Sequence, residues 1–167
     1  TINTGNDSCE NAVAVSCGDV VNGETVSDSD SGGNAAPDEF YTYTGNGTLE
    51  EVTISLCNNT DFNSVLRVYE DCTLTNEIAM NDDSCGEQSE VSFVSDGTST
   101  YYIMVEGFES EAGNFSLEVS CEELPENDIC SGALPISCGE SITGSTDDAT
   151  IDVDAPVCNT DITAPGL

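Results

Sequence analysis

Carboxylates are the only side chains numerous enough in this sequence to do chemistry. The 167 residues include 33 Asp and Glu, a single basic residue, Arg67, and no histidine, giving a formal net charge of -32. Serine or cysteine nucleophiles would lack a histidine base, and phosphoryl transfer would lack its positive clamp. A pair of carboxylates could hydrolyse a glycosidic bond, but no pair stands out among so many acids. The composition therefore indicates a protein that is not an enzyme.

Calcium is the ligand that the acidic residues predict best. Asp28 and Asp30 alternate in the segment Asp28-Ser29-Asp30-Ser31-Gly32, and a second oxygen-rich turn consists of Asn81, Asp82 and Asp83. Calcium requires six or more oxygen ligands, and the first segment is not an EF-hand, because the bidentate Glu of that loop is missing. The alternative is that these Asp and Asn side chains only cap their own turns.

The charge and the apolar pattern also limit the partners of the chain. A surface with one cation repels nucleic acid and anionic lipid, because it cannot release their counterions. No run of about 18 apolar residues is present, so we expect no membrane insertion. Copies of the chain itself, divalent cations and polysaccharide are left as plausible partners.

Nine cysteines predict disulfides and an oxidising compartment, so we expect a secreted or cell-surface protein. Zinc is less favoured, since no Cys-x-x-Cys pair and no histidine is present. Sequence alone does not determine connectivity. The pairing that we favour is Cys9–Cys17, Cys72–Cys85, Cys57–Cys121 and Cys130–Cys138, with Cys158 unpaired.

Three sequons predict N-linked glycans at Asn46, Asn58 and Asn114. Asn6 also fits the acceptor pattern, but its counterpart in the repeat described below does not, so a turn or capping role is favoured for it. Such sequons also arise by chance in chains rich in Ser, Thr and Asn.

Short alternating segments predict the fold. Residues 51–56, 91–94, 101–105 and 115–119 alternate apolar and polar side chains, and residues 40–43 and 65–69 are rich in aromatic and β-branched side chains. This period of two is the signal of β-strands, and clusters of Gly, Asn and Asp separate the segments. The expected fold class is all-β, an antiparallel jelly-roll-like β-sandwich.

A repeat divides the chain. Residues 127–144 match residues 6–23 in their Asn-Asp motif, cysteines, glycines and apolar positions, at an offset of 127 − 6 = 121 residues. Such a fixed period predicts an array of modules. We therefore expect a complete sandwich over residues 1–121, a short linker over 122–126 and the N-terminal strands of a second module over 127–167. The residues expected to matter for assembly are Asn127, Asp128, Cys158 and Leu167.

An ordered set of motifs in residues 6–121 resembles the bacterial pre-peptidase C-terminal domain and its tandem-repeat relatives. The set comprises Asn6-Asp7-x-Cys9-x-x-Ala12, Ala36-Pro37-Asp38-x-Phe40-Tyr41, Val65-x-x-Val68-Tyr69, Asn81-Asp82-Asp83-x-Cys85-Gly86, Tyr101-Tyr102-Ile103-x-Val105-x-Gly107 and Gly113-Asn114-Phe115-x-Leu117. The resemblance implies a jelly-roll-like sandwich attached to secreted enzymes or repeated along surface proteins. Relatives in this broader family include calcium- and collagen-binding modules.

The function predicted from the sequence is structural. We expect a module of a secreted or cell-surface repeat protein that assembles into an extracellular filament or surface layer, through module–module contacts that include strand addition. The alternative is an accessory domain that binds carbohydrate or matrix. In that case its tyrosines would stack on sugars.

Overall fold

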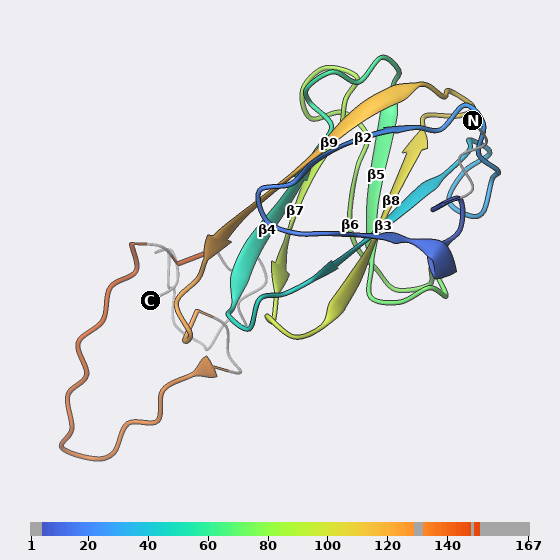
Figure 1. Cartoon of the computed structure of the whole chain (residues 1–167). Helices are drawn as coiled ribbons and strands as arrows, with labels where there is room; N and C mark the ends of the chain where they lie inside the picture. The colour runs from blue at the N-terminus through green and yellow to red at the C-terminus, as the bar shows by residue number, and fades with distance from the viewer. Residues whose placement is uncertain (1–4, 129–131, 148, 151–167) are drawn as a thin grey trace. The chain divides into compact units, whose positions relative to one another are not determined.

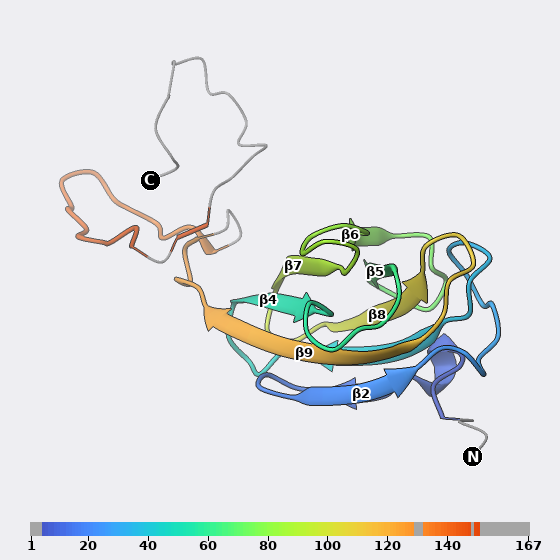
Figure 2. The same cartoon turned by 90° about the horizontal axis from the view of Figure 1, so that it is seen from above.

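Two β-sheets packed face to face form the fold. The computed structural model describes residues 5–128, 132–147 and 149–150. The first sheet has the order β1 (Val13–Val15), β3 (Glu39–Thr44), β8 (Thr100–Gly107), β5 (Ser64–Tyr69), β6 (Glu77–Asn81), and the second has the order β2 (Val20–Glu24), β9 (Asn114–Glu123), β4 (Glu50–Ser55), β7 (Glu90–Ser95). Figures 1 and 2 show the two layers. The predicted all-β sandwich is confirmed.

Strand pairing is antiparallel except at one edge. The pairs β2–β9, β3–β8, β4–β7, β5–β6 and β5–β8 are antiparallel, whereas β1 runs parallel to β3, with Val15 opposite Tyr43. The 3-10 helix η1 (Cys9–Asn11) directly precedes β1. None of the helices in the described ranges is long and apolar enough to cross a membrane.

The main core lies between the sheets. Alternation places Val52 and Ile54 of β4 inward, where they pack with Tyr41 and Tyr43 of β3 and Leu117 of β9. The six segments predicted from the sequence all form strands, and the period of two is clearest in β4 and β7, which bury alternate residues. Strand β6 was not predicted, because it is an edge strand whose Ile78 and Met80 are exposed and only Ala79 packs on the core.

A smaller core covers the opposite face of the first sheet. Phe40, Tyr69 and Met104 project there and pack against Cys9 of η1. The N-terminal segment therefore shields the outer face of β3, which explains why successive residues of this strand are buried on both sides.

The disulfides link segments that are distant in sequence, and the three predicted pairings in this part of the chain are wrong. The bonds are Cys9–Cys72, Cys17–Cys121 and Cys57–Cys85. Cys9 lies in η1, before β1, whereas Cys17 lies between β1 and β2, where the chain passes from the first sheet to the second, so the two cysteines meet different partners. Cys138 is exposed and free. The predicted Cys130–Cys138 bond involves Cys130, which, like Cys158, lies outside the described residues.

The chain divides into two compact units between Glu122 and Glu123. Strand β9 extends into the segment that was expected to be a linker, since Glu122 and Glu123 are its last two residues. In the second unit Asn127 is exposed and Asp128 is half-buried, and the apolar side chains of Leu134, Ile136 and Ile142 are exposed. Leu167 lies outside the described residues.

Candidate cation site

Three segments that are distant in sequence lie side by side at one end of the first sheet. The N–H of Phe40 donates to the carbonyl of Asn6 at 2.8 Å, and the N–H of Asp38 donates to the carbonyl of Ser29 at 3.1 Å. The hydroxyl of Ser31 donates to the carbonyl of Asp7 at 3.0 Å. The N-terminal Asn-Asp motif, the Asp28–Gly32 loop and the start of β3 thus form one local structure. We call Asp7, Asp28, Asp38 and Glu39, the acids that these three segments carry next to the contacts, the acidic cluster.

Asp7 holds the Asp28–Gly32 loop in place. Its Oδ1 accepts hydrogen bonds from the N–H and the hydroxyl of Ser29, at 2.6 and 3.0 Å, and its Oδ2 also accepts from the hydroxyl at 3.0 Å. Because Ser29 stands between Asp28 and Asp30, this contact fixes the backbone that carries both predicted calcium ligands.

Asp38 is fully buried, and only one of its carboxylate oxygens has a partner. Oδ2 accepts the N–H groups of Ser31 at 2.6 Å and Gly32 at 2.9 Å, whereas Oδ1 has no hydrogen-bond partner among the described residues. Burial raises the pKa of Asp38 to about 7, and the charges of Glu106 and Asp30 raise this pKa further against the lowering effect of the two N–H donors.

Asp28 is a second carboxylate with two buried oxygens that lack hydrogen-bond partners among the described residues. Burial raises the pKa of Asp28 to about 7, and the negative charges of Glu39, Asp7 and Glu24 contribute to the increase. Glu39 is itself buried and accepts the hydroxyl of Tyr41 at 3.1 Å.

The acidic cluster has the chemistry of a site for a hard cation. Uncompensated carboxylates in a protein interior cost several kcal/mol, so they take up a proton or pair with a cation. Calcium binds carboxylate oxygens and tolerates irregular coordination, and the orphaned oxygens of Asp28 and Asp38 fit it. Of the two ligands predicted in this segment, Asp28 has buried carboxylate oxygens, whereas Asp30 is exposed.

The second predicted calcium turn has a different structure. Asn81 is the last residue of β6 rather than part of a turn, and its Oδ1 accepts the N–H of Glu90 at 3.4 Å. Asp82 is half-buried and Asp83 is exposed, and neither carries one of the orphaned buried oxygens found among the described residues. Calcium at this position is still a prediction that nothing in the structure favours.

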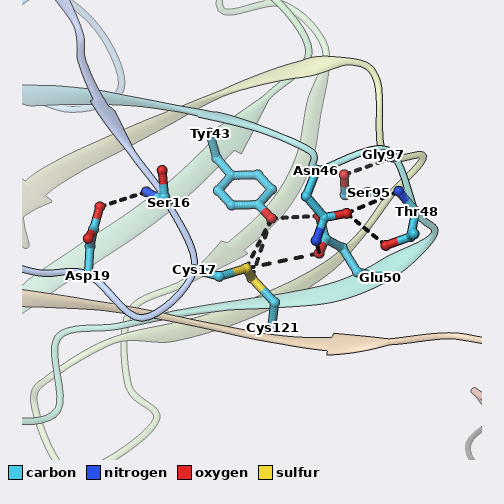
Figure 3. Close-up of a disulfide and its surroundings, with 10 residues drawn as sticks. All are labelled: Ser16, Cys17, Asp19, Tyr43, Asn46, Thr48, Glu50, Ser95, Gly97 and Cys121. Carbon is cyan, nitrogen blue, oxygen red and sulfur yellow. Dashed lines mark hydrogen bonds between the residues drawn. A yellow bond between two sulfur atoms is a disulfide. The ribbon is translucent and has the colours of Figure 1, made fainter.

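Glu50 is buried beside the Cys17–Cys121 disulfide, but both of its carboxylate oxygens accept hydrogen bonds (Figure 3). Its Oε1 accepts the hydroxyl of Tyr43 at 2.6 Å, and its Oε2 accepts the side-chain amide of Asn46 at 3.0 Å. Burial and this contact raise the pKa of Tyr43 well above its usual range. Although Cys17, Glu50 and Cys121 lie close enough to hold a metal, the two sulfurs are bonded to each other and are not thiolate ligands.

The predicted glycosylation sites differ in exposure. Asn46 and Asn58 are exposed, and the hydroxyl of Thr48 donates to the Oδ1 of Asn46 at 2.7 Å within the first sequon. Asn114 is exposed, but the sequon hydroxyl belongs to Ser116, which is buried. Asn6 is buried, in agreement with a structural role. Glycans at Asn46 and Asn58 therefore fit the folded surface best and are still a prediction.

The tyrosines proposed to stack on sugars are largely buried. Tyr41, Tyr43, Tyr69 and Tyr101 belong to the two cores, and Tyr102 is half-buried. They are packing residues in this structure, so no aromatic platform for carbohydrate is present among them.

Several solved structures are similar to this chain, and two of them are described here. No protein-family model matches it, and no curated protein matches its sequence. The pre-peptidase C-terminal domain of a collagenase from Bacillus anthracis has a TM-score of 0.47 and 15% identity, over 65% of this chain and 94% of that one. The Aeromonas hydrophila protein PliG, a periplasmic inhibitor of g-type lysozyme, has a TM-score of 0.43 and 13% identity, over 66% of this chain and 97% of that one. At these values neither similarity assigns a family or an activity, and the family resemblance stays a prediction.

Proposed function

We propose that the chain is a calcium-stabilised, non-catalytic structural module of a secreted or cell-surface protein, which assembles with neighbouring copies or repeats into an extracellular filament or surface layer. The orphaned carboxylate oxygens of Asp28 and Asp38 carry the calcium part of the proposal. The three disulfides support an oxidising environment. The repeat in the sequence supports assembly from similar units.

Calcium would be held by chain segments that must meet for the sandwich to be complete. Asp28 and Asp38 supply the orphaned oxygens. Asp7 and Glu39 add negative charge beside Asp28, and Glu106 and Asp30 add it beside Asp38. A bound divalent cation would neutralise this charge and hold the N-terminal segment and the Asp28–Gly32 loop against β3. It would also reduce the repulsion between modules that each carry a large negative charge.

Calcium is expected to raise the melting temperature of the chelator-treated protein by several degrees at pH 8, with saturation at one or a few ions per chain. The Asp28→Asn and Asp38→Asn variants should lose most of this increase, because each removes a ligand charge. Both variants should also be more stable than the original chain without calcium, because a buried anion has been removed. Differential scanning calorimetry and isothermal titration measure these effects.

Asp83→Asn is the matched control, since it removes one exposed acid from the other predicted turn. It should keep the full response to calcium. Equal losses in all three variants, or no heat and no change in melting temperature for the original chain, would overturn the calcium proposal.

The pH dependence of stability follows from the two raised pKa values. The pKa of Asp28 and of Asp38 is about 7 in the folded chain, against an ordinary value of 3.8, so the folded state holds their protons more tightly than the unfolded state does. Their contribution is fully present below pH 4 and is lost as the pH rises to about 7.

Calcium-free protein is therefore expected to melt at progressively lower temperature from pH 4 to pH 8. Calcium must displace the protons, so its stabilising effect should increase over the same interval. Melting curves at each pH with calcium and with chelator test this. The Asp28→Asn/Asp38→Asn double variant should show a flatter profile, and a profile as steep as the original would assign the pH dependence to other groups.

A further inference from the structure

The second unit reproduces the hydrogen bond that holds the Asp28–Gly32 loop in the first. Asp128 accepts the N–H of Thr150 at 2.9 Å and its hydroxyl at 2.5 Å. Asp7 accepts the same two groups of Ser29, and in both cases the partners are 22 residues apart. The sequence repeat is therefore accompanied by the same side-chain contact at this position in both units.

The turn between the two repeated strand positions is also the same. The N–H of Ser16 donates to the carboxylate of Asp19, and the N–H of Ser137 donates to the carboxylate of Glu140, both at 2.8 Å. The glycine between them has a positive φ in each copy, 85° at Gly18 and 93° at Gly139. Segment 132–147 thus has the turn needed to place two strands on opposite sheets.

The first unit shows what covers such a segment. Val15 lies opposite Tyr43 of β3 and is buried, Val21 pairs with Leu117 of β9 and packs on the core, and Cys17 bonds to Cys121 at the end of β9. The counterparts of these three residues at the offset of 121 are Ile136, Ile142 and Cys138. The two isoleucines are 62% and 50% exposed, and the cysteine is free.

We propose that segment 132–147 is an exchangeable copy of residues 11–26 that docks on a second copy of this chain, where it takes the place of β1 beside β3 and of β2 beside β9. This inference deepens the proposed assembly and rests on it. Ile136 would lie beside the partner copy's β3, Ile142 beside its β9, and Cys138 would bond to its Cys121. A second copy of this chain is the expected partner, because residues 11–26 already make the same contacts with β3, β9 and Cys121 within the first unit.

Disulfide exchange would complete the docking without an added oxidant. The thiolate of Cys138 attacks the sulfur of Cys121 in the second copy, a Cys138–Cys121 bond forms, the Cys17–Cys121 bond breaks, and Cys17 leaves as a thiolate. One disulfide and one thiolate are present before and after the step. Cys17 is exposed and Cys121 is half-buried in the sandwich, so the bond lies near the surface. The formal charge of -32 per copy opposes association, so exchange should require salt or a divalent cation.

The test uses the full chain as a mixture of isotopically labelled and unlabelled copies, incubated with calcium and a trace of reduced glutathione. Peptide mapping under non-reducing conditions should find Cys138 linked to Cys121, with labelled and unlabelled peptides joined, and Cys17 free. Non-reducing gels should show a ladder that the Cys138→Ser variant lacks. A Cys138 that stays free, or that links only within one copy, would overturn the inference.

A matched pair of variants separates docking from a chance disulfide. Leu134 and Ile136 are both exposed, but their counterparts differ, since Val13 is 42% exposed and Val15 is 3% exposed. Ile136→Asp should therefore slow formation of the Cys138–Cys121 bond at least tenfold, whereas Leu134→Asp should leave it within about twofold. Equal rates would show that the strand position does not matter and would reject docking. A chain that responds to calcium but forms no such bond would reject this inference alone.

Discussion

Replacing Arg67 by methionine is expected to destabilise the sandwich by about 3–5 kcal/mol, the usual cost of leaving one partner of a buried ion pair uncompensated. Arg67 lies on β5, and its Nε donates to the Oε1 of Glu106 at 2.6 Å, while Glu106 on the neighbouring β8 is completely buried. The other carboxylate oxygen of Glu106, Oε2, accepts a hydrogen bond from the N–H of Asn34 at 3.0 Å. The lone basic residue of the sequence thus neutralises a carboxylate that has no exposed surface. Urea unfolding measures the loss.

Two further variants decide the cause of that loss. Glu77 pairs with the other end of Arg67 at 2.7 Å but is partly exposed, so Glu77→Gln should cost no more than about 1 kcal/mol. The Arg67→Met/Glu106→Met variant removes both buried partners and should recover much of the stability lost in Arg67→Met. If the double variant is as unstable as the single one, the methionine packs poorly and the charge is not the cause.

Removal of the Cys17–Cys121 bond by a double serine substitution is expected to have an effect of similar size. The bond closes a loop with a sequence separation of 104, for which loop-closure entropy predicts about 4.7 kcal/mol of stabilisation. The bond also covers Glu50 and Tyr43 at the end of the core, so that its loss would admit water to this carboxylate. Equilibrium unfolding in urea, with the same slope in both proteins, measures the difference.

The Cys57–Cys85 bond provides the internal comparison. Its sequence separation is 28, for which the same relation gives about 3.6 kcal/mol. Removing it should therefore be less harmful than removing Cys17–Cys121 by about 1 kcal/mol. The reverse order would show that strain or local packing, rather than the length of the closed loop, determines the contribution of each bond.

Strands that bury one face could be predicted from the sequence, because their apolar and polar side chains alternate along the chain. β4 shows this best, since Val52 and Ile54 face the core and the residues between them are only partly buried. β6 was missed because an edge strand buries little, and Ile78 and Met80 gave no inward period. Local pattern is therefore sufficient where a strand has a covered face and insufficient where it has none.

The pairing of cysteines and the acidic cluster depend on contacts that no local pattern contains. Cys9 and Cys17 are close in sequence, but the first lies on the outer face of one sheet and the second at the end of the other. The importance of Asp7 and Asp38 was likewise not predicted, because they meet the Asp28–Gly32 loop only through backbone contacts between three distant segments. The available signals were the repeated Asn-Asp motif and the Ala-Pro-Asp motif, which marked these residues without showing that they meet.

The Cys17–Cys121 bond also determines how a pulling force would pass through the first unit. A load applied at its two ends would travel from Cys17 across the sulfur atoms to Cys121, and the strands between them would carry none of it. The 104 residue steps that the bond bypasses would otherwise lengthen the chain by roughly 340–370 Å when stretched. A thread built from such units would behave as a chain of short, nearly inextensible links under tension, and only cleavage of this disulfide, by reduction or by thiol exchange, would release the bypassed residues.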